Sequence, residues 1–231
     1  MKKILLPLLL ILAVGMLAAV ESEPSEVVGY FKKNIGDGEW QAISLPFFYS
    51  SLIVGDVLGT QFSELDAIQD VNTGASTIYY ADFGWFGDIE NLSYGTAYFI
   101  NRTSGNGATD YFLLGKVDPQ GFSKTIVGNG AYTAFGLNEA TEIELTDDLF
   151  GTNESDGDVV QDINTGASSI YYSGFGWFGD LTQLSPTVGY YYNSAFGSSD
   201  FVWTYEPTRG VSRVDQTKNK KSKLGVKNEK H

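Results

Sequence analysis

The chain has 231 residues, no cysteine, a single histidine and a formal net charge of −13. That histidine is the last residue, His231, so the body of the chain lacks the usual zinc, copper and haem ligands and any Ser-His-Asp or Cys-His nucleophile. Without cysteine, disulfides and a lipidated lipoprotein leader are also excluded. We therefore expect no cofactor and no enzymatic activity; a glycosidase, which needs only two carboxylates, is a distant third hypothesis.

Charge divides the chain into an acidic body and a basic end. Residues 21–207 hold 26 of the 28 acidic groups and five bases, whereas residues 208–231 hold eight bases and two acids. An acidic body repels phosphate, so we do not expect a nucleic-acid partner. The basic end has too few apolar residues to order itself, and 208–231 is predicted to be a disordered tail. Alternatively, this tail is a tether to anionic envelope polymer, to lipid headgroups or to the acidic body of a neighbouring copy.

Residues 1–20 have the layout of a secretory signal peptide. Lys2 and Lys3 precede an apolar run over residues 4–14, and small residues that include Ala18 and Ala19 follow it. Cleavage is expected after Ala19 or within a few residues of it. The competing interpretation is an uncleaved membrane anchor, although the run from 4 to 20 has 17 residues and spanning usually takes about 20. We therefore expect an exported protein, extracellular or on the cell surface, with a membrane contact only if the segment stays uncleaved.

The body is rich in Tyr, Phe and Gly and sparse in Pro, which favours an all-β fold of strands joined by tight turns. The first two strands are predicted at 27–31 and 39–48, joined as a hairpin by a turn at 36–38 whose glycines supply positive φ. An equivalent hairpin is predicted from 122–127 and 131–136. Residues 51–65 are less regular and are predicted to be loop; the alternative is one helical turn at 56–59, with 147–151 as its counterpart.

A tandem repeat then organises the chain. Residues 68–101 align without a gap to 160–193, and 20 of the 34 positions are identical at a constant offset of 92. A period of about 90 residues fits a small domain that was duplicated once. We predict two homologous β-rich units, 27–119 and 120–207, sandwich- or barrel-like, either in tandem or packed as one pseudo-symmetric body. Further strands are expected at 75–83, 84–88, 96–102 and 111–117, and in the second unit at 188–193 and 201–205.

Each unit carries the motif Phe-Gly-Trp-Phe-Gly-Asp, at 83–88 and at 175–180. One interpretation makes each Trp the central core residue of its unit, with glycine allowing strands to approach closely. The other makes the aromatic rings platforms for sugar stacking, and two equal platforms would gain avidity for a polymeric glycan. The residues of this hypothetical ligand site are Trp85, Phe86, Asp88, Trp177, Phe178 and Asp180.

Calcium is the one metal that the composition leaves open. Asp156 and Asp158 place oxygen ligands on a tight loop, as a hard cation prefers, but the full spacing of a calcium loop is absent. Asp is also a favoured turn former, which is the competing interpretation. Three Asn-x-Ser/Thr sequons, at Asn91, Asn101 and Asn153, are candidate glycosylation sites on an exported protein.

A family resemblance follows from several of these motifs. The stretches Val27-Val-Gly-Tyr30, Trp40-Gln-Ala-Ile-Ser-Leu-Pro46 and Ile78-Tyr-Tyr80, followed by Trp85 and Ala97-Tyr-Phe99, resemble the repeats of uncharacterised secreted or surface-attached prokaryotic proteins. The likeness covers nearly all of 27–207, but the second copy has Gly136-Leu-Asn138 where the first has Ser-Leu-Pro. It implies location and architecture and brings no catalytic residues.

Together these features predict a non-enzymatic extracellular or cell-surface structural or adhesion protein. Its expected partners are cell-envelope polymer or other surface proteins. The alternative is a carbohydrate-binding module that takes a glycan on its paired aromatic platforms.

The first testable prediction concerns export. Because 1–20 has the charged, apolar and small-residue parts of a signal peptide, the secreted protein should begin near Val20. Intact-mass spectrometry of secreted material measures this directly. Full-length protein that retains Met1 and stays in the cytoplasm would contradict the prediction.

Overall fold

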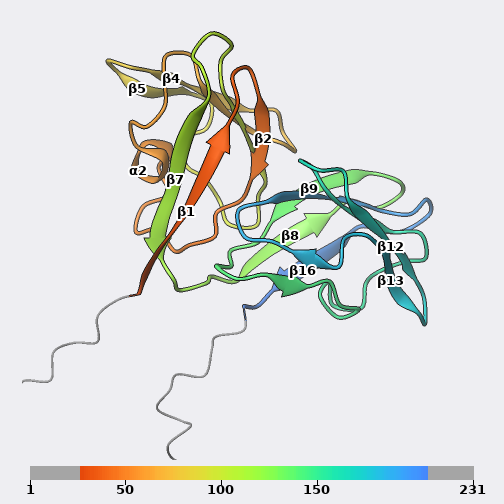
Figure 1. Ribbon diagram of the computed structural model, residues 1–231. Helices are drawn as coiled ribbons and strands as arrows, with labels where there is room; N and C mark the ends of the chain where they lie inside the picture. The colour runs from red at the N-terminus through yellow and green to blue at the C-terminus, as the bar shows by residue number, and fades with distance from the viewer. Residues whose placement is uncertain (1–26, 208–231) are drawn as a thin grey trace, which may run out of the picture.

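The computed structural model describes residues 27–207; the predicted signal peptide and the predicted basic tail lie outside these residues. The described chain consists almost entirely of antiparallel β-strands, which confirms the all-β fold (Figure 1). Among the described residues, no helix is long and apolar enough to cross a membrane. We call residues 27–119 repeat 1 and residues 120–207 repeat 2.

Repeat 1 forms two sheets and one short helix. Its elements are β1 (Val28–Ile35), β2 (Trp40–Ile43), α2 (Val54–Leu58), β3 (Ala67–Asp70), β4 (Ser76–Tyr80), β5 (Gly84–Gly87), β6 (Tyr98–Asn101) and β7 (Thr109–Lys116). Five strands make a sheet of order β2-β6-β3-β4-β5, and β1 pairs with β7 as a separate ribbon.

Repeat 2 has the same two sheets. Its strands are β8 (Phe122–Ile126), β9 (Tyr132–Gly136), β10 (Ile143–Glu144), β11 (Val159–Asp162), β12 (Ser168–Tyr172), β13 (Gly176–Gly179), β14 (Gln183–Leu184), β15 (Gly189–Asn193) and β16 (Phe201–Tyr205). The five-stranded sheet has the order β9-β15-β11-β12-β13, the ribbon is β8-β16, and β10 pairs with β14. Matching strands of the two large sheets are 92 residues apart, since β3 ends at Asp70 and β11 at Asp162. The common strand order is what a tandem repeat predicts. Where repeat 1 has α2, residues 147–151 form only a turn.

The hairpin predicted from 27–31 and 39–48 is wrong. β1 pairs with β7, with Val28 opposite Lys116, while β2 pairs with β6 in the other sheet. The equivalent hairpin of repeat 2 is wrong for the same reason, because β8 pairs with β16 and β9 with β15. In each repeat the glycine turn carries the chain from one layer to the other. The two strands therefore face each other across a core instead of sharing a sheet edge.

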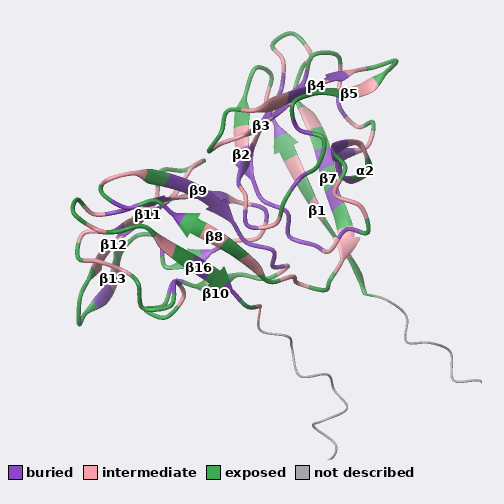
Figure 2. Ribbon diagram, turned by 180° about the vertical axis from the view of Figure 1, so that it is seen from behind, coloured by how far each residue is buried: buried purple, intermediate pink, exposed green. Residues whose placement is uncertain are grey.

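Each repeat has a hydrophobic core between its ribbon and its large sheet (Figure 2). In repeat 1, Ile35 of β1 packs in the same cluster as Ile68 of β3. In repeat 2 the centre is Trp203 of β16, whose ring lies 5.2 Å from Phe135 and 4.7 Å from Phe150. The Trp203 indole N–H donates to the carbonyl of Leu149 at 2.7 Å, so this large side chain is buried with its polar atom satisfied.

Two asparagines join the repeats reciprocally. The Asn72 amide donates to the carbonyl of Ala134 at 2.8 Å, and its oxygen accepts the Ala134 N–H at 2.6 Å. Asn164 makes the same pair of bonds with Ala42, at 2.8 and 2.7 Å. Ala42 and Ala134 lie in β2 and β9, which are edge strands. Each asparagine thus satisfies the backbone groups that an edge strand leaves open. We call these two contacts the amide clips.

Small residues let the two sheets approach at this interface. The Ser44 N–H donates to Thr187, and the Gly136 N–H donates to Gly95, both at 3.3 Å. A Cβ placed on Gly136 would lie 2.2 Å from the Cβ of Ser44, so this position admits only glycine unless the repeats separate.

Burial lowers the pKa of Lys33, and the nearby carboxylate of Asp162 in the other repeat opposes that shift.

Asn138 of repeat 2 makes a further contact between the repeats, and this contact is not reciprocal. Its side-chain amide donates to the carbonyls of Leu45 and Phe47, both at 2.8 Å. Its oxygen accepts the N–H of Gln120 at 2.5 Å. Asn138 stands where repeat 1 has Pro46, so the departure from the Ser-Leu-Pro pattern noted in the sequence has a structural role between the repeats.

The amide clips yield the second prediction. Asn72→Ala and Asn164→Ala each remove two hydrogen bonds and leave a part-buried backbone N–H and C=O unpaired, which should cost about 1–3 kcal/mol of unfolding free energy. Urea denaturation of both single variants and of the double variant measures this. Asn91→Ala, at an exposed position, is the control and should change stability by less than about 0.5 kcal/mol. Clip variants as stable as the control would contradict the assigned role.

Candidate functional site

The two aromatic motifs fall on matching hairpins, β4–β5 and β12–β13. Strand alternation turns Trp85 towards the core of repeat 1 and the neighbouring Phe86 away from it. The Trp85 ring lies 5.3 Å from both Phe62 and Tyr79. The rings of Trp85 and Phe86 therefore do not form one flat platform, although both residues also line one cavity.

The outer face of each hairpin carries a cluster of aromatic rings, all of them exposed except half-buried Tyr80. In repeat 1 the Phe86 ring lies 6.1 Å from Tyr80 and 6.5 Å from Phe83. In repeat 2 the Phe178 ring lies 5.9 Å from Tyr172. The exposed fraction is 77% for Phe83 and 80% for its counterpart Phe175. We call these sets the outer aromatic clusters: Tyr80, Phe83 and Phe86 in repeat 1, and Tyr172, Phe175 and Phe178 in repeat 2.

The two outer aromatic clusters belong to hairpins that lie far apart. The β4–β5 hairpin and the β12–β13 hairpin lie at opposite ends of the molecule in both views (Figures 1 and 2). Asp88 and Asp180 follow the two hairpins directly and are exposed. Their backbone N–H groups donate to the carbonyls of Ser76 at 2.8 Å and Ser168 at 3.0 Å, which fixes the backbone of both residues at the ends of the hairpins.

A cavity of about 470 Å³ lies between α2 and β5 in repeat 1. Phe83, Trp85 and Phe86 line it together with Ile53, Val54 and Glu90. The Trp85 indole N–H is directed to the carbonyl of Gly59 at 3.1 Å. Trp85 thus supports the core with one side and forms part of a cavity wall with another.

The inner face of repeat 2 has different chemistry. The Trp177 ring lies 5.3 Å from Tyr171, as Trp85 does from Tyr79, but its buried indole nitrogen has no hydrogen-bond partner within residues 27–207. Glu154 stands at the position of Phe62, and both of its carboxylate oxygens are covered without a partner in the same part of the chain. Burial raises the pKa of Glu154. The repeats therefore agree on the outer face of the hairpin and differ beneath it.

The candidate calcium residues serve the backbone. Asp158 is buried, and its carboxylate accepts the Tyr192 hydroxyl at 2.6 Å and the Ala195 N–H at 2.6 Å. Asp156 is exposed and accepts the N–H of Ser173. Within the described residues, no three His, Cys, Asp or Glu side chains are grouped so that they could hold a metal ion. The two aspartates thus act as acceptors that hold loops, which is the geometry of the turn interpretation.

The three sequon asparagines differ in their surroundings. Asn91 and Asn153 are exposed, and Asn101 is half-buried in β6. The Asn153 amide donates to the carbonyl of Phe150 at 2.8 Å, and the Asn101 amide donates to Glu39 at 3.3 Å. A glycan on Asn101 or Asn153 would replace one hydrogen of an amide nitrogen that already donates a bond, so exposed Asn91 is the most accessible of the three.

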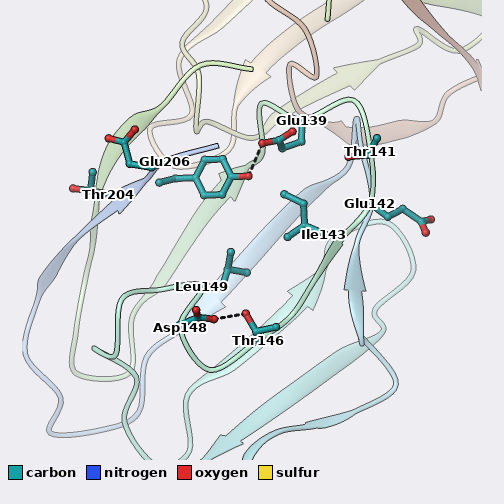
Figure 3. Close-up of a pocket in the computed structure, with 10 residues that line it drawn as sticks. Glu139, Thr141, Glu142, Ile143, Thr146, Asp148, Leu149, Thr204 and Glu206 are labelled. Atoms are coloured by element: carbon teal, nitrogen blue, oxygen red, sulfur yellow. Dashed lines mark hydrogen bonds between the residues drawn. The ribbon is translucent and has the colours of Figure 1, made fainter. Parts of the chain in front are cut away.

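Sequence reasoning missed a second candidate site in repeat 2, an acidic groove of about 540 Å³ (Figure 3). Its wall carries four carboxylates and three threonine hydroxyls. We define the acidic groove by Glu139, Thr141, Glu142, Ile143, Thr146, Asp148, Leu149, Thr204, Tyr205 and Glu206. Glu139 is only 8% exposed, and its carboxylate accepts the hydroxyl of Tyr205 at 2.7 Å. Burial raises the pKa of Glu139, and the bond from Tyr205 opposes the shift.

Repeat 1 has a groove of about 280 Å³ at the same place with other chemistry. There Ser50 stands for Glu142 and Leu114 for Glu206, and Lys116 adds a positive charge. The aligned pair Asp56 and Asp148 is the one position that is acidic in both grooves. Aligning the repeats at their offset of 92 residues reveals these exchanges, which was the signal available in the sequence.

Comparison of the chain with protein-family models, curated proteins and solved structures finds no match. The resemblance to secreted repeat proteins accordingly stays a prediction. The function has to be argued from the two candidate sites themselves.

The third prediction separates the inner and outer rings of the hairpins. Trp85→Ala and Trp177→Ala should each cost about 3 kcal/mol or slightly less, because each ring is half-buried against several aromatic side chains. Phe83→Ala and Phe175→Ala, at exposed positions, should cost less than about 0.5 kcal/mol. Urea denaturation of the four variants measures these losses of unfolding free energy. Tryptophan variants that unfold like the phenylalanine variants would mean that the tryptophans are not structural.

Proposed function

We propose that the protein is a non-enzymatic extracellular or cell-surface structural or adhesion protein, and that its outer aromatic clusters are the adhesive surfaces. The observation that carries the proposal is the duplicated exposure of these rings. Phe83 and Phe86 in repeat 1, and Phe175 and Phe178 in repeat 2, are each more than half exposed. Exposed apolar residues are common singly, but the same exposed set in both repeats is better explained by binding.

The positions of the clusters support a bridging role. They lie at opposite ends of one body whose repeats are joined by the amide clips, so a single molecule can engage two partners or two places on a polymer (Figure 1). Two linked sites raise avidity by about 10²–10⁴ over one site when both can engage. Cell-envelope polymer and other surface proteins are the partners expected for an exported, acidic protein of this kind.

A carbohydrate-binding module is the second candidate. Sugar rings stack on aromatic faces, and carboxylates accept hydrogen bonds from their hydroxyls. The cavity in repeat 1 offers Phe83, Phe86 and Trp85 with Glu90 on its wall, and Asp88 lies next to it in the chain. This arrangement favours a glycan as the bound polymer. It supports binding and does not require catalysis.

The fourth prediction tests both candidates. Beads that carry the protein should adhere to immobilised cell-envelope polysaccharide, and Phe83→Ser/Phe86→Ser or Phe175→Ser/Phe178→Ser should each weaken adhesion about 10-fold or more through lost avidity. The variant with all four changes should lose adhesion. Tyr30→Ser/Leu114→Ser is the matched control, because it removes two equally exposed apolar side chains from the β1–β7 ribbon.

The outcomes separate the hypotheses. Competition by soluble oligosaccharide identifies the surface as a carbohydrate-binding site. Adhesion that needs the clusters but resists oligosaccharide favours a protein partner. If Tyr30→Ser/Leu114→Ser loses adhesion and the variant with all four Phe→Ser substitutions keeps it, the clusters are not the adhesive surfaces and the proposal is wrong.

A further inference from the structure

We propose that the acidic groove of repeat 2 binds the basic C-terminal segment of the same chain, residues 208–231. The groove and the segment lie next to each other in the chain, because Glu206 lines the groove and the first base of the segment is Arg209. This contact is independent of the proposed adhesion function. It assigns an occupant to the largest of the three cavities described here.

The charges of the two parts are complementary. The groove carries Glu139, Glu142, Asp148 and Glu206 and no basic side chain. The whole of 120–207 contains twelve acids and one base, Lys124, and Lys124 is not among the residues that line the groove. Repeat 2 therefore supplies no basic side chain to the wall of the groove. Residues 208–231 hold eight bases and two acids.

The groove is shaped for lysine or arginine in more than charge. Thr141, Thr146 and Thr204 offer hydroxyl oxygens, which accept hydrogen bonds from an ammonium group with three donors. Ile143 and Leu149 provide apolar wall for the methylene stem of such a side chain. Because Glu139 is nearly buried and held by Tyr205, one carboxylate is already positioned at the wall.

Connection within one chain favours this occupant over a free cationic peptide. Lys218 follows Pro207 by 11 residues, and at about 3.3–3.6 Å per residue a chain of that length reaches any part of a groove that starts at Glu206. A tethered segment has an effective concentration on the order of mM, so even weak ion pairs keep it bound. A segment that cannot bury apolar surface by itself gains its contacts from the groove.

Repeat 1 offers an internal comparison. Its equivalent groove combines Asp56 with Lys116 and is about half the size, about 280 Å³. It has no cluster of carboxylates to attract a basic segment. Docking should therefore be confined to repeat 2.

Paramagnetic relaxation in the full chain tests the proposal and is the fifth prediction. The chain has no cysteine, so Ser222→Cys provides a single site for a nitroxide label. In a ¹⁵N-labelled protein, amide signals of Thr141, Ile143 and Leu149 should broaden strongly, while those of Ser50 and Ser51 in the repeat 1 groove should not. The broadening should disappear in about 1 M salt, where the Debye length is about 3 Å.

Matched variants decide whether the groove is responsible. Glu142→Gln/Asp148→Asn/Glu206→Gln should abolish the broadening, and Asp82→Asn/Asp88→Asn/Glu90→Gln, which removes the same charge from an exposed region of repeat 1, should leave it intact. Uniform broadening over both repeats, or loss of broadening in both variants, overturns the proposal. A mixed sample gives a further test, in which chains with the nitroxide but no ¹⁵N are combined with ¹⁵N chains that carry no nitroxide. Broadening in this mixture also overturns the proposal, since the occupant of the groove would then be the segment of a second copy.

Discussion

The amide clips between the repeats are the contact on which the rest of the structure depends. Each large sheet ends in a short edge strand, β2 or β9, whose backbone groups need partners. Asn72 and Asn164 supply them from the other repeat, with the same pair of hydrogen bonds in both directions. Such reciprocity is the property of a two-fold interface between identical subunits, and here one chain provides both halves. The clips close two edges and direct the two aromatic hairpins to opposite ends (Figure 1).

The two repeats satisfy equivalent buried carboxylates in different ways, so they are not interchangeable. Asp66 in repeat 1 pairs with Arg102 at 2.5 Å, whereas its counterpart Asp158 accepts the hydroxyl of Tyr192 at 2.6 Å. In repeat 2 no cation balances this carboxylate, and the covered carboxylate oxygens of half-buried Glu154 add a second acid nearby. What both repeats keep alike is the set of outer rings and the asparagine of each clip. The repeats therefore resemble each other at the outer face of the hairpins and at the interface, and differ in their interiors.

Charge distinguishes the second repeat from the first. Its groove concentrates carboxylates next to the point where the chain turns basic, so the docking proposed above would compete with attraction of the basic segment to an anionic surface. An occupied groove would withdraw the basic segment from envelope polymer or lipid, and salt would release it. Adhesion by the aromatic clusters, which depends on apolar contact, would respond to salt much less.

The sequence by itself determined the all-β class, because strand alternation and turn residues are local properties, and it predicted two homologous units from a constant offset of 92 residues. It pointed to the aromatic hairpins. It could not show that Trp85 faces the core and Phe86 faces solvent, since the face that is buried depends on which layer covers the strand. Only the tertiary structure decided that β1 pairs with β7 and not with β2, because pairing between residues more than 70 positions apart follows from core packing. The acidic groove is of the same kind: Glu139 and Glu206 are far apart in the chain, and their meeting depends on the fold that brings β16 beside the segment after β9.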